Sequence, residues 1–571
     1  MIETDVRAVL EAMRRPPFSL DDEAIAWVKS HLASLSPEEK IGQLFCNILG
    51  SFDRDAFVAS LEVCKPGGLM YVPADAEAAI EFSGALRDLL PVPALIAANL
   101  EKGGDGIVAG GVSFGSPTAV AATDDVANAT RLGDVCGAEG AAVGANWAFA
   151  PIIDIDDNFR NPITGLRTFG SNPERVRDMG VAYVEAVQAH GVAASIKHFP
   201  GDGRDERDQH LVTTVNDLSV EEWDATYGEV YRASIEAGAM TVMVGHIQQP
   251  EYSRTLRPGI RDEDILPGSL APEIMGDLLR GKLGFNGLTV TDASTMAGFL
   301  IPLPRSKAVP AAIAAGADMF LFARNLAEDV AFMRAGVEDG TITPGRFDSA
   351  VARVLGLKAA LGLHKPAAPL SVEAARATIG SDRHQQWSQE IADRSITLVK
   401  EQDGVLPLSP QTHKRILFIP LEDDSSEAYG VRVGACEEVR QLLVAEGFEA
   451  ATFVAPTSFD AGPTTDVTDA YDAIVYVANI STQITQNTVR ITWAQPFGSN
   501  TPQFVASVPT IFVSLENPYH LLDVPRVKTF INTFGSTPTI LKALVDKLVG
   551  RSAFTGTSPA DPFCGRWDAR L

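Results

Sequence analysis

The chain has 571 residues and a formal net charge of −26 at pH 7, because 73 acidic side chains outnumber 47 basic ones. At roughly 150 residues per domain this length corresponds to about two to four domains, which excludes a single small binding module. Hydrophobic residues make up 46% of the chain and charged residues 21%, as in globular proteins, which excludes wholesale disorder. The negative charge argues against nucleic acid or an anionic membrane surface as a partner, because both attract positive charge.

The cysteines and the N-terminus indicate the cellular compartment. The five cysteines lie far apart and form no CxxC pair, which is typical of reduced thiols and not of a disulfide framework or a zinc site. Acidic Glu3 and Asp5 stand where a signal peptide would be basic, and no run approaches the roughly 18 apolar residues of a membrane helix. We therefore expect a soluble, cytoplasmic protein.

Short apolar runs alternate with stretches of helical periodicity between residues 40 and 360. Nearly continuous apolar runs are typical of strands buried on both faces of a parallel sheet. The alternation predicts a (β/α)8 barrel of the triosephosphate isomerase type over residues 1–365; an open doubly wound sheet would give the same local pattern. The predicted strands are 68–72, 94–101, 146–155, 193–199, 240–247, 288–293 and 317–323, and the clearest helices are 173–190 and 272–283.

The pattern changes near residue 364, where a connector rich in proline and alanine begins. We predict a linker and connecting helix over residues 366–395. Residues 396–571 are predicted to form a second domain, an α/β sandwich with an open sheet. Its expected strands are 415–421, 471–480 and 510–519, with a helix at 435–447.

Polar residues stand at the C-terminal ends of several predicted barrel strands. Barrel enzymes build their active sites from these strand ends, and a buried Lys-His pair is costly without partners. The alternative is that the strands simply finish in polar loops. The residues concerned are Asn99, Glu101, Asp154, Asp156, Lys197, His198, His246 and Asp292.

The densest polar stretch is KHFPGDGRDERDQHLVTT, residues 197–214. Its proline and glycines predict a loop that is able to move, from Pro200 to His210. Asp208 and His210 are two residues apart, and a carboxylate beside an imidazole fixes the tautomer and adjusts the basicity of a general acid or base. A solvated histidine in an exposed polar loop is the alternative.

Asp292 ends an apolar strand and is followed by small residues that leave room for a substrate. A carboxylate in this position can be a nucleophile, a metal ligand or an acceptor for sugar hydroxyl groups. Metal binding is the weakest of these interpretations, because no His/Asp/Glu cluster with ligand spacing lies nearby.

Six ordered segments together resemble glycoside hydrolase family 3, and within it the bacterial exo-acting β-N-acetylglucosaminidases. The resemblance extends from about Ser36 to the TGTSPADP segment at 555–562. The segments are GANWAFAPIIDI (144–155), TGLRTFG (164–170), KHFPGDG (197–203), MVGHI (243–247), PGSLAPEIMGDLLRGKLGFNGLTVTDA (267–293) and VSLENPYHLLDVP (513–525).

The resemblance implies a retaining exo-glycosidase that removes terminal, non-reducing β-linked N-acetylglucosamine from peptidoglycan fragments or chitooligosaccharides. It implies that Asp292 is the nucleophile of a covalent glycosyl intermediate and that Asp208 and His210 form the acid/base dyad. It also implies that no cofactor or metal is needed. The positions that hold the sugar would be Asn99, Arg167, Lys197, His198 and His246.

Three positions depart from the family pattern. Asp202 replaces a histidine after Pro-Gly, and Asn99 replaces an aspartate that normally accepts hydrogen bonds from the sugar. Gln209 stands where a small residue is common inside the dyad. The Asn99 amide leaves the sugar preference open.

Several alternatives therefore remain at the level of the sequence. Phosphate could replace water as the acceptor, because a histidine acid/base does not repel it as a carboxylate would. A β-glucosidase and a catalytically silent sugar-binding protein are the other candidates. In each case we expect a carbohydrate partner, with no nucleic acid and no membrane, and the second domain either supports the barrel, contributes to the cleft or makes the contacts of a homodimer.

Overall fold

The computed structural model describes residues 5–366, 368–402, 404–422, 432–458, 462–482, 484–486 and 488–571. The chain divides into two compact units, each assembled from separate segments of the sequence. The second unit includes two segments from within the predicted barrel domain. The first unit comprises Met1–Val112, Ala129–Ile155 and Pro173–His384, and the second Ser113–Asn128, Asp156–Asn172 and Gln385–Leu571.

The first unit is built on an eight-stranded sheet in the order β10-β1-β2-β3-β4-β5-β7-β9, and all its pairings are parallel. Backbone hydrogen bonds from Asp318 N to Thr289 O (2.8 Å) and from Thr291 N to Met319 O (3.1 Å) close the sheet between β9 and β10. The predicted parallel barrel is therefore confirmed. The strands are β1 (Phe45–Leu49), β2 (Gly68–Tyr71), β3 (Leu95–Ala98), β4 (Trp147–Ala148), β5 (Ala193–Phe199), β7 (Thr241–Val244), β9 (Leu288–Thr291) and β10 (Phe320–Leu321).

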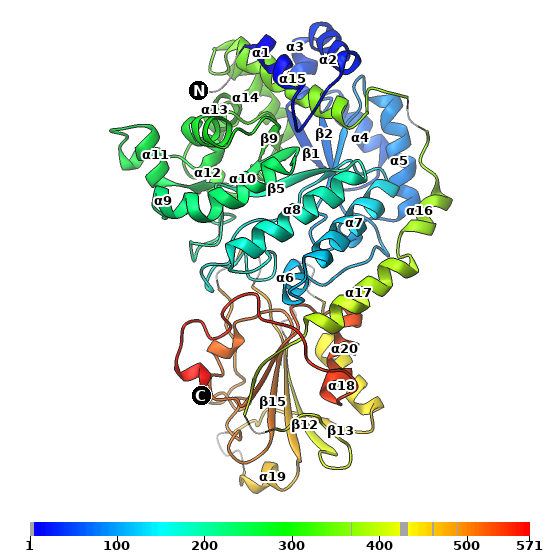
Figure 1. Cartoon of the computed structure of the whole chain (residues 1–571), viewed down its shortest axis with the longest axis vertical. Coiled ribbons are helices and arrows are strands. Elements are labelled where there is room, and N and C mark those ends of the chain that lie inside the picture. Colours follow the sequence, from blue (N-terminus) through cyan, green and yellow to red (C-terminus); the bar gives the residue numbers. More distant parts are fainter. Residues whose placement is uncertain are drawn as a thin grey trace. The chain divides into compact units, whose positions relative to one another are not determined.

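A helix follows each barrel strand, and Figure 1 shows helices such as α7 and α8 outside the strands. These two helices approach closely at Gly133, where an added Cβ would come within 2.7 Å of the Ala186 side chain. The helices that follow the strands are α4 (Arg54–Leu61), α5 (Ala76–Leu89), α7 (Val126–Ala142), α8 (Pro173–Ala189), α10 (Glu229–Glu236), the π-type helix Glu273–Lys282, α13 (Arg305–Ala315) and α14 (Leu326–Glu338). Further helices of this unit are α1 (Val6–Ala12), α2 (Asp22–Ser34), α3 (Pro37–Gln43), α9 (Val220–Trp223), α11 (Pro250–Leu256), α12 (Ala297–Leu300), α15 (Pro344–Ala360) and α16 (Val372–Thr378).

The barrel strands differ from the prediction in two respects: one strand was missed, and β3, β4, β7 and β10 are each shorter than the predicted run. Strand β1 was not predicted, because its short FCNIL run contains Asn47 and follows α3 after only one intervening residue. Strand β4 is much shorter than the predicted run 146–155, since Pro151 has no amide hydrogen to donate to a neighbouring strand. The apolar composition of residues 146–155 located β4 correctly but did not fix its length.

A buried cluster of charges lies at the N-terminal side of β9 and β10. Asp318 is fully buried and binds Arg280 Nη2 through Oδ2 and Arg346 Nη2 through Oδ1, both at 2.7 Å. Arg353 Nη1 lies 3.7 Å from the same Oδ1. Burial alone would raise the pKa of Asp318, but the three guanidinium groups outweigh it and hold that pKa below its ordinary value.

We expect Asp318→Asn to lower the free energy of unfolding by about 3–5 kcal/mol, because it leaves buried guanidinium groups without a countercharge. Urea unfolding would measure the loss. Asp348→Asn is the matched control: it removes a part-exposed ion pair, and its cost should stay below about 1 kcal/mol. Equal losses for the two variants would contradict this account.

The second unit contains a six-stranded mixed sheet in the order β11-β16-β15-β14-β12-β13, in which only the β11–β16 pairing is antiparallel. This confirms the predicted second α/β fold. Its strands are β11 (Thr397–Glu401), β12 (Arg415–Glu422), β13 (Glu449–Thr452), β14 (Ala473–Asn479), β15 (Thr510–Ser514) and β16 (Thr529–Asn532), and its helices include α6 (Pro117–Ala122), α17 (Asp382–Ser395, from Gln385 onward), α18 (Ala435–Ala445), α19 (Thr465–Thr468) and α20 (Pro538–Leu548).

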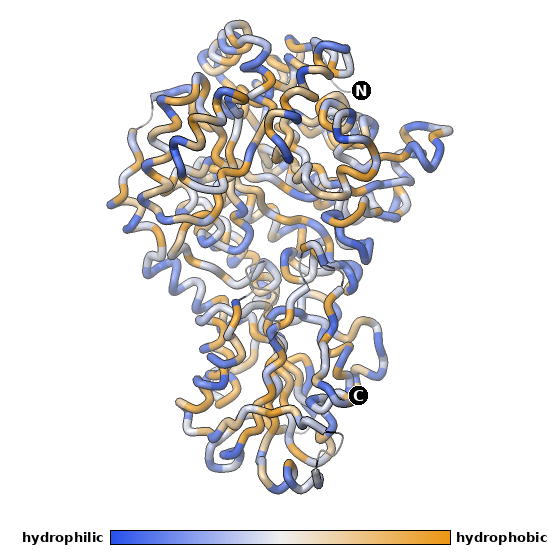
Figure 2. The backbone as a smooth tube through the Cα atoms, turned by 180° about the vertical axis from the view of Figure 1, so that it is seen from behind, coloured by the Kyte–Doolittle hydropathy of each residue, from blue (hydrophilic) through white to orange (hydrophobic). Residues whose placement is uncertain are grey.

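The central strands β14 and β15 are buried along their whole length, and apolar stretches, drawn in orange, run through this unit in Figure 2. Alternate residues of β14 serve the two faces: Val475 and Val477 join one core cluster, and Ile474 and Tyr476 join the other. This is the period-two alternation of a strand whose two faces are both covered. The segment 113–128 belongs to this unit because, for example, the Ser116 hydroxyl donates to the Phe534 carbonyl (2.6 Å).

Asp156 is a buried carboxyl group of the second unit. The Thr164 hydroxyl donates to its Oδ1 (2.7 Å), and the Tyr519 hydroxyl donates to its Oδ2. Burial raises the pKa of Asp156 to about 6, although both hydroxyls act in the opposite direction. A carboxyl pKa raised by folding disfavours the ionised form, so this contribution to stability is fully present below the unfolded value of 3.8 and is lost as the pH rises through about 6.

Asp156→Asn should therefore gain stability relative to wild type as the pH rises. Both partners are hydroxyls, which can accept as well as donate, so the new amide fits the site. We expect the difference in unfolding free energy between variant and wild type to shift by about 1 kcal/mol between pH 5 and pH 8 in favour of the variant. Urea unfolding at the two pH values would measure this shift, and a pH-independent difference would contradict it.

Candidate active site

The C-terminal ends of the barrel strands bring together seven of the eight predicted site residues. Asp292 directly follows β9, Asn99 directly follows β3, and His246 comes two residues after β7. Because the strands are parallel, these ends lie at one edge of the barrel, where barrel enzymes place their catalytic groups. The seven residues are Asn99, Lys197, His198, Asp208, His210, His246 and Asp292, all in the first unit.

Asp292 is 8% exposed and its backbone amide donates to the Val244 carbonyl (2.8 Å). Its Oδ1 accepts the Ala293 amide (2.7 Å), and its Oδ2 lies 4.0 Å from His198 Nε2. Burial alone would raise the pKa of Asp292, but the three neighbouring imidazoles and the Ala293 amide outweigh it, so the pKa lies below its ordinary value. Asp292 is therefore an ionised carboxylate with one oxygen, Oδ2, free of backbone donors.

Asp154 holds His198 in its orientation toward Asp292. Its Oδ2 lies 2.7 Å from His198 Nδ1, and its Oδ1 accepts the His198 amide (3.1 Å). A carboxylate at Nδ1 places the proton there and leaves Nε2 facing Asp292. Asp154 was noted in the sequence only as a polar residue at a strand end, and it had no assigned role.

His246 is fully buried, and both its ring nitrogens have protein partners. Nε2 lies 3.0 Å from the Ala293 carbonyl, which can only accept, so Nε2 carries a hydrogen. Nδ1 lies 2.8 Å from Ser269 Oγ. Burial lowers the pKa of His246, and the attraction of Asp292 offsets this only in part. The imidazole is therefore neutral near pH 7.

The predicted dyad is formed. Asp208 Oδ1 lies 2.7 Å from His210 Nδ1 and also accepts the His210 amide (2.8 Å). Asp208 is fully buried, whereas the His210 side chain is 21% exposed. The carboxylate places a proton on Nδ1, which leaves Nε2 as the atom that can gain and lose a proton.

The loop that carries the dyad is held at several points. Its end forms β6 (Thr214–Val215), which pairs with β8 (Ile247–Gln248) after the end of β7. Its middle docks on the segment after Asp292, since the Ala297 amide donates to the His210 carbonyl (2.9 Å). The sequence predicted a loop able to move; in this structure its contacts bring the dyad to the same edge of the barrel as Asp292.

Lys197 and Asn99 occupy contrasting positions. Lys197 is buried, and its Nζ binds Glu101 Oε1 at 2.7 Å. This ion pair compensates a buried ammonium group. Asn99 is exposed at the end of β3. Glu101 is a further charged group of the site; its place at a strand end was visible in the sequence, but no role was predicted for it.

Arg167 is the predicted site residue that lies outside the first unit. It belongs to the segment Asp156–Asn172 of the second unit. It is half-buried, and its amide donates to the Thr164 carbonyl (2.9 Å). Its role in holding a sugar stays a prediction.

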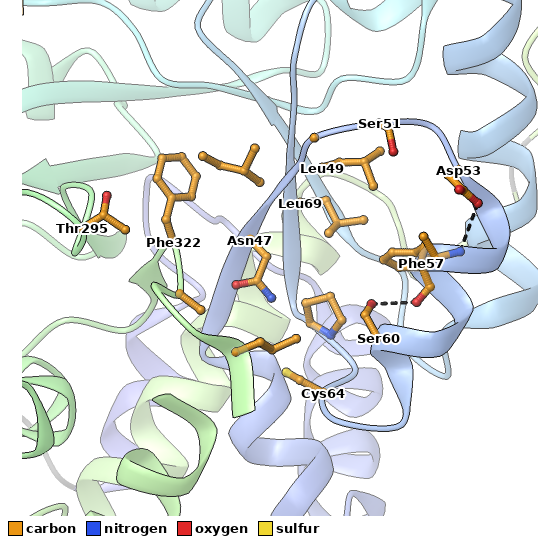
Figure 3. Close-up of a pocket in the computed structure, with 16 residues that line it drawn as sticks. Asn47, Leu49, Ser51, Asp53, Phe57, Ser60, Cys64, Leu69, Thr295 and Phe322 are labelled. Atoms are coloured by element: carbon orange, nitrogen blue, oxygen red, sulfur yellow. Dashed lines mark hydrogen bonds between the residues drawn. The ribbon is translucent and has the colours of Figure 1, made fainter. Parts of the chain in front are cut away.

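A hollow of about 390 Å³ lies beside β1, β2 and α4, and Figure 3 shows the side chains that surround it. Its lining is largely apolar and includes Leu49, Phe57 and Phe322. Thr295, three residues after Asp292 in the chain, also lines the hollow. None of the eight predicted site residues lines it. We therefore locate the candidate chemistry at the dyad and Asp292.

The described part of the chain was considered for metal ligands and for membrane-spanning helices. No group of three or more His, Cys, Asp or Glu side chains there is arranged to hold a metal ion. No helix among the same residues is long and apolar enough to cross a membrane.

Comparison with known proteins identifies the family. Residues 38–357 match the family model for the glycosyl hydrolase family 3 N terminal domain. A β-N-acetylglucosaminidase/β-glucosidase from Cellulomonas fimi is 51% identical over 97% of this chain and 99% of its own length.

Solved structures agree with these matches. The β-glucoside phosphorylase BglX is 44% identical, with a TM-score of 0.93 over 98% of this chain and 100% of its own. A family 3 β-N-acetylglucosaminidase from Paenibacillus sp. str. FPU-7 is 26% identical, with a TM-score of 0.76 over 93% of this chain and 99% of its own. The predicted family and enzyme class are confirmed: the chain belongs to glycoside hydrolase family 3.

Proposed function

We propose that this protein is a retaining exo-glycosidase that releases terminal, non-reducing β-linked N-acetylglucosamine, from peptidoglycan fragments or chitooligosaccharides, and that it also accepts β-glucosides. The observation that carries the proposal is the pair of groups at one barrel edge: a buried carboxylate, Asp292, and an imidazole backed by a carboxylate, His210 with Asp208. The name of the Cellulomonas fimi relative, which includes both activities, supports the choice of sugars.

The first step is transfer of the sugar to Asp292. Protonated His210 Nε2 donates its proton to the glycosidic oxygen while Asp292 Oδ2 attacks the anomeric carbon. The bond from that carbon to the glycosidic oxygen breaks, and the aglycone leaves as an alcohol. His198, oriented by Asp154, faces the same Asp292 oxygen.

The second step releases the sugar. His210 Nε2, now without its proton, takes one from a water molecule, whose oxygen attacks the anomeric carbon. The bond from that carbon to Asp292 breaks, so the carboxylate and the protonated imidazole are regenerated. Two displacements on the same carbon give retention of configuration.

Phosphorolysis is a second candidate for the acceptor step. An imidazole does not repel an incoming phosphate as a carboxylate acid/base would, and a relative covering 98% of this chain is named a β-glucoside phosphorylase. The acidic residues of the loop are engaged within the protein: Asp205 binds Arg207 at 2.6 Å, and Asp208 binds His210. This reduces the repulsion that the loop would exert on phosphate.

Product analysis with p-nitrophenyl N-acetyl-β-glucosaminide and p-nitrophenyl β-glucoside, each with and without phosphate, tests both candidates. Free sugar of retained configuration in both buffers supports hydrolysis, and a sugar 1-phosphate formed only with phosphate supports phosphorolysis. Turnover of the glucoside alone would overturn the proposed preference for N-acetylglucosamine. If neither substrate is cleaved and calorimetry still detects sugar binding, the protein is a sugar-binding protein and the proposal fails.

A further inference from the structure

Gln209 lies between the two members of the dyad in the sequence, and its side chain joins three segments of the barrel edge. It is fully buried. Its Oε1 accepts the backbone amide of His246 (2.8 Å), and its Nε2 donates to Asp202 Oδ2 (3.3 Å). One carboxamide therefore connects the dyad loop, the turn after β5 and the end of β7.

The donors and acceptors at this carboxamide are matched. The His246 amide can only donate, so Oε1 must face it, and Nε2 then faces a carboxylate, which accepts. The other oxygen of Asp202 accepts the Gly203 amide (2.7 Å). Neither an apolar side chain nor a carboxylate at position 209 could satisfy both partners, and an unsatisfied buried polar group is costly.

The backbone next to His210 is held from a second direction. The Gly298 amide donates to the Gln209 carbonyl (3.2 Å), and an added Cβ at Gly298 would come within 2.4 Å of that carbonyl oxygen. The Ala297 amide donates to the His210 carbonyl (2.9 Å). Residue 209 is thus fixed through both its side chain and its backbone, and the His210 imidazole is attached to the next residue.

The same bonds lead to the nucleophile. The Asp202 amide donates to Asp154 Oδ1 (2.8 Å), and Asp154 orients His198, whose Nε2 faces Asp292. On the other side, the His246 ring contacts the carbonyl of Ala293, the residue after Asp292. Gln209 is therefore connected to the surroundings of both proposed catalytic groups.

We propose that Gln209 is a positioning residue for the acid/base His210, with Asp202 as its anchor, an inference that rests on the proposed function. Gln209 acts through the placement of His210 and not through the substrate. Misplacing a catalytic group by about 1 Å can cost roughly 100-fold in rate. The two residues that depart from the family pattern near the dyad, Asp202 and Gln209, are partners of one another.

Two single variants test the placement. Gln209→Met keeps the length but removes the hydrogen bonds to Asp202 and from the His246 amide, and Gln209→Glu sets two buried carboxylates against each other. For a phenyl glycoside, which needs a proton on its leaving group, we expect kcat to fall about 10- to 100-fold with little change in KM. Cleavage of a 2,4-dinitrophenyl glycoside to the glycosyl intermediate needs no such proton, so its pre-steady-state burst rate should stay near that of wild type.

A charge exchange tests the pairing itself. In Asp202→Asn alone, one amide must meet two donors, Gly203 N and Gln209 Nε2. In the double variant Asp202→Asn/Gln209→Glu the new amide donates to the new carboxylate, and the carboxylate still accepts the His246 amide. We expect the double variant to recover phenyl glycoside cleavage to within about threefold of wild type, a coupling typical of residues in direct contact.

Glu206→Gln is the matched control, because it exchanges a carboxylate for an amide on the exposed part of the same loop and should change neither rate. Equal losses on both aglycones, no loss in the single variants, or no recovery in the double variant would overturn the inference while leaving the proposed function intact. If the single variants fail to fold, the double variant decides, since it restores the hydrogen bond between residues 202 and 209 and keeps those to the Gly203 and His246 amides. A wild-type protein inert on both aglycones overturns the proposed function and this inference together.

Discussion

Asp292→Asn is expected to lower kcat/KM for p-nitrophenyl N-acetyl-β-glucosaminide by about 10⁴-fold or more, because an amide oxygen is a far weaker nucleophile than the carboxylate for which we propose this role. The amide is nearly isosteric and can still accept the Ala293 amide, so the fold should be unchanged. Initial rates with the aryl glycoside would measure the loss. Asp178→Asn, which alters an exposed carboxylate on α8, is the control and should leave the rate unchanged.

Chemical rescue separates a lost nucleophile from a disturbed site. Asp292→Gly removes the carboxylate, and added azide can attack the anomeric carbon from the vacated side. Because only one displacement then occurs, the product should be a glycosyl azide of inverted configuration. Residual hydrolysis within tenfold of wild type in both Asp292 variants, or the absence of azide product, would refute the assigned role.

His210→Ala is expected to reduce cleavage according to how much help the leaving group needs. General acid catalysis contributes about 10²- to 10⁴-fold, so a phenyl glycoside should lose about 10³-fold in kcat/KM. A 2,4-dinitrophenyl glycoside should lose far less, because its phenolate departs without a proton. The pH profile of kcat/KM should also lose the limb that reports the acid/base group.

A uniform loss across leaving groups would argue that His210 only supports the structure. Asp208→Asn is the useful companion variant: it removes the negative charge behind Nδ1 while retaining a hydrogen-bonding partner. Its losses should follow the same dependence on the leaving group and be smaller than those of His210→Ala, since the imidazole itself remains. An Asp208→Asn variant with wild-type rates would remove Asp208 from the dyad.

The prediction of the barrel relied on the local pattern of apolar residues, and the errors in its strands come from the same reliance. Strand β5 was predicted with its observed bounds, 193–199, whereas β7 (241–244) is shorter than the predicted run 240–247. Strand β1 was missed because five residues containing an asparagine carry little pattern of their own. The predicted domain boundaries at residues 365 and 395 stay predictions; the compact units instead draw on separate segments of the chain.

The sequence by itself determined the alternation of strands and helices, the polar strand ends and the motifs of the family, because these features depend on neighbouring residues. It also placed Asp208 beside His210, a contact between residues only two apart. Only the tertiary structure decided which side chains pair with one another. Asp154 contacts His198, 44 residues away in the sequence, and Gln209 contacts His246, 37 residues away. Such pairs are set by the register of the closed barrel and by the path of one loop across its edge, and neither leaves a periodic signal in the chain.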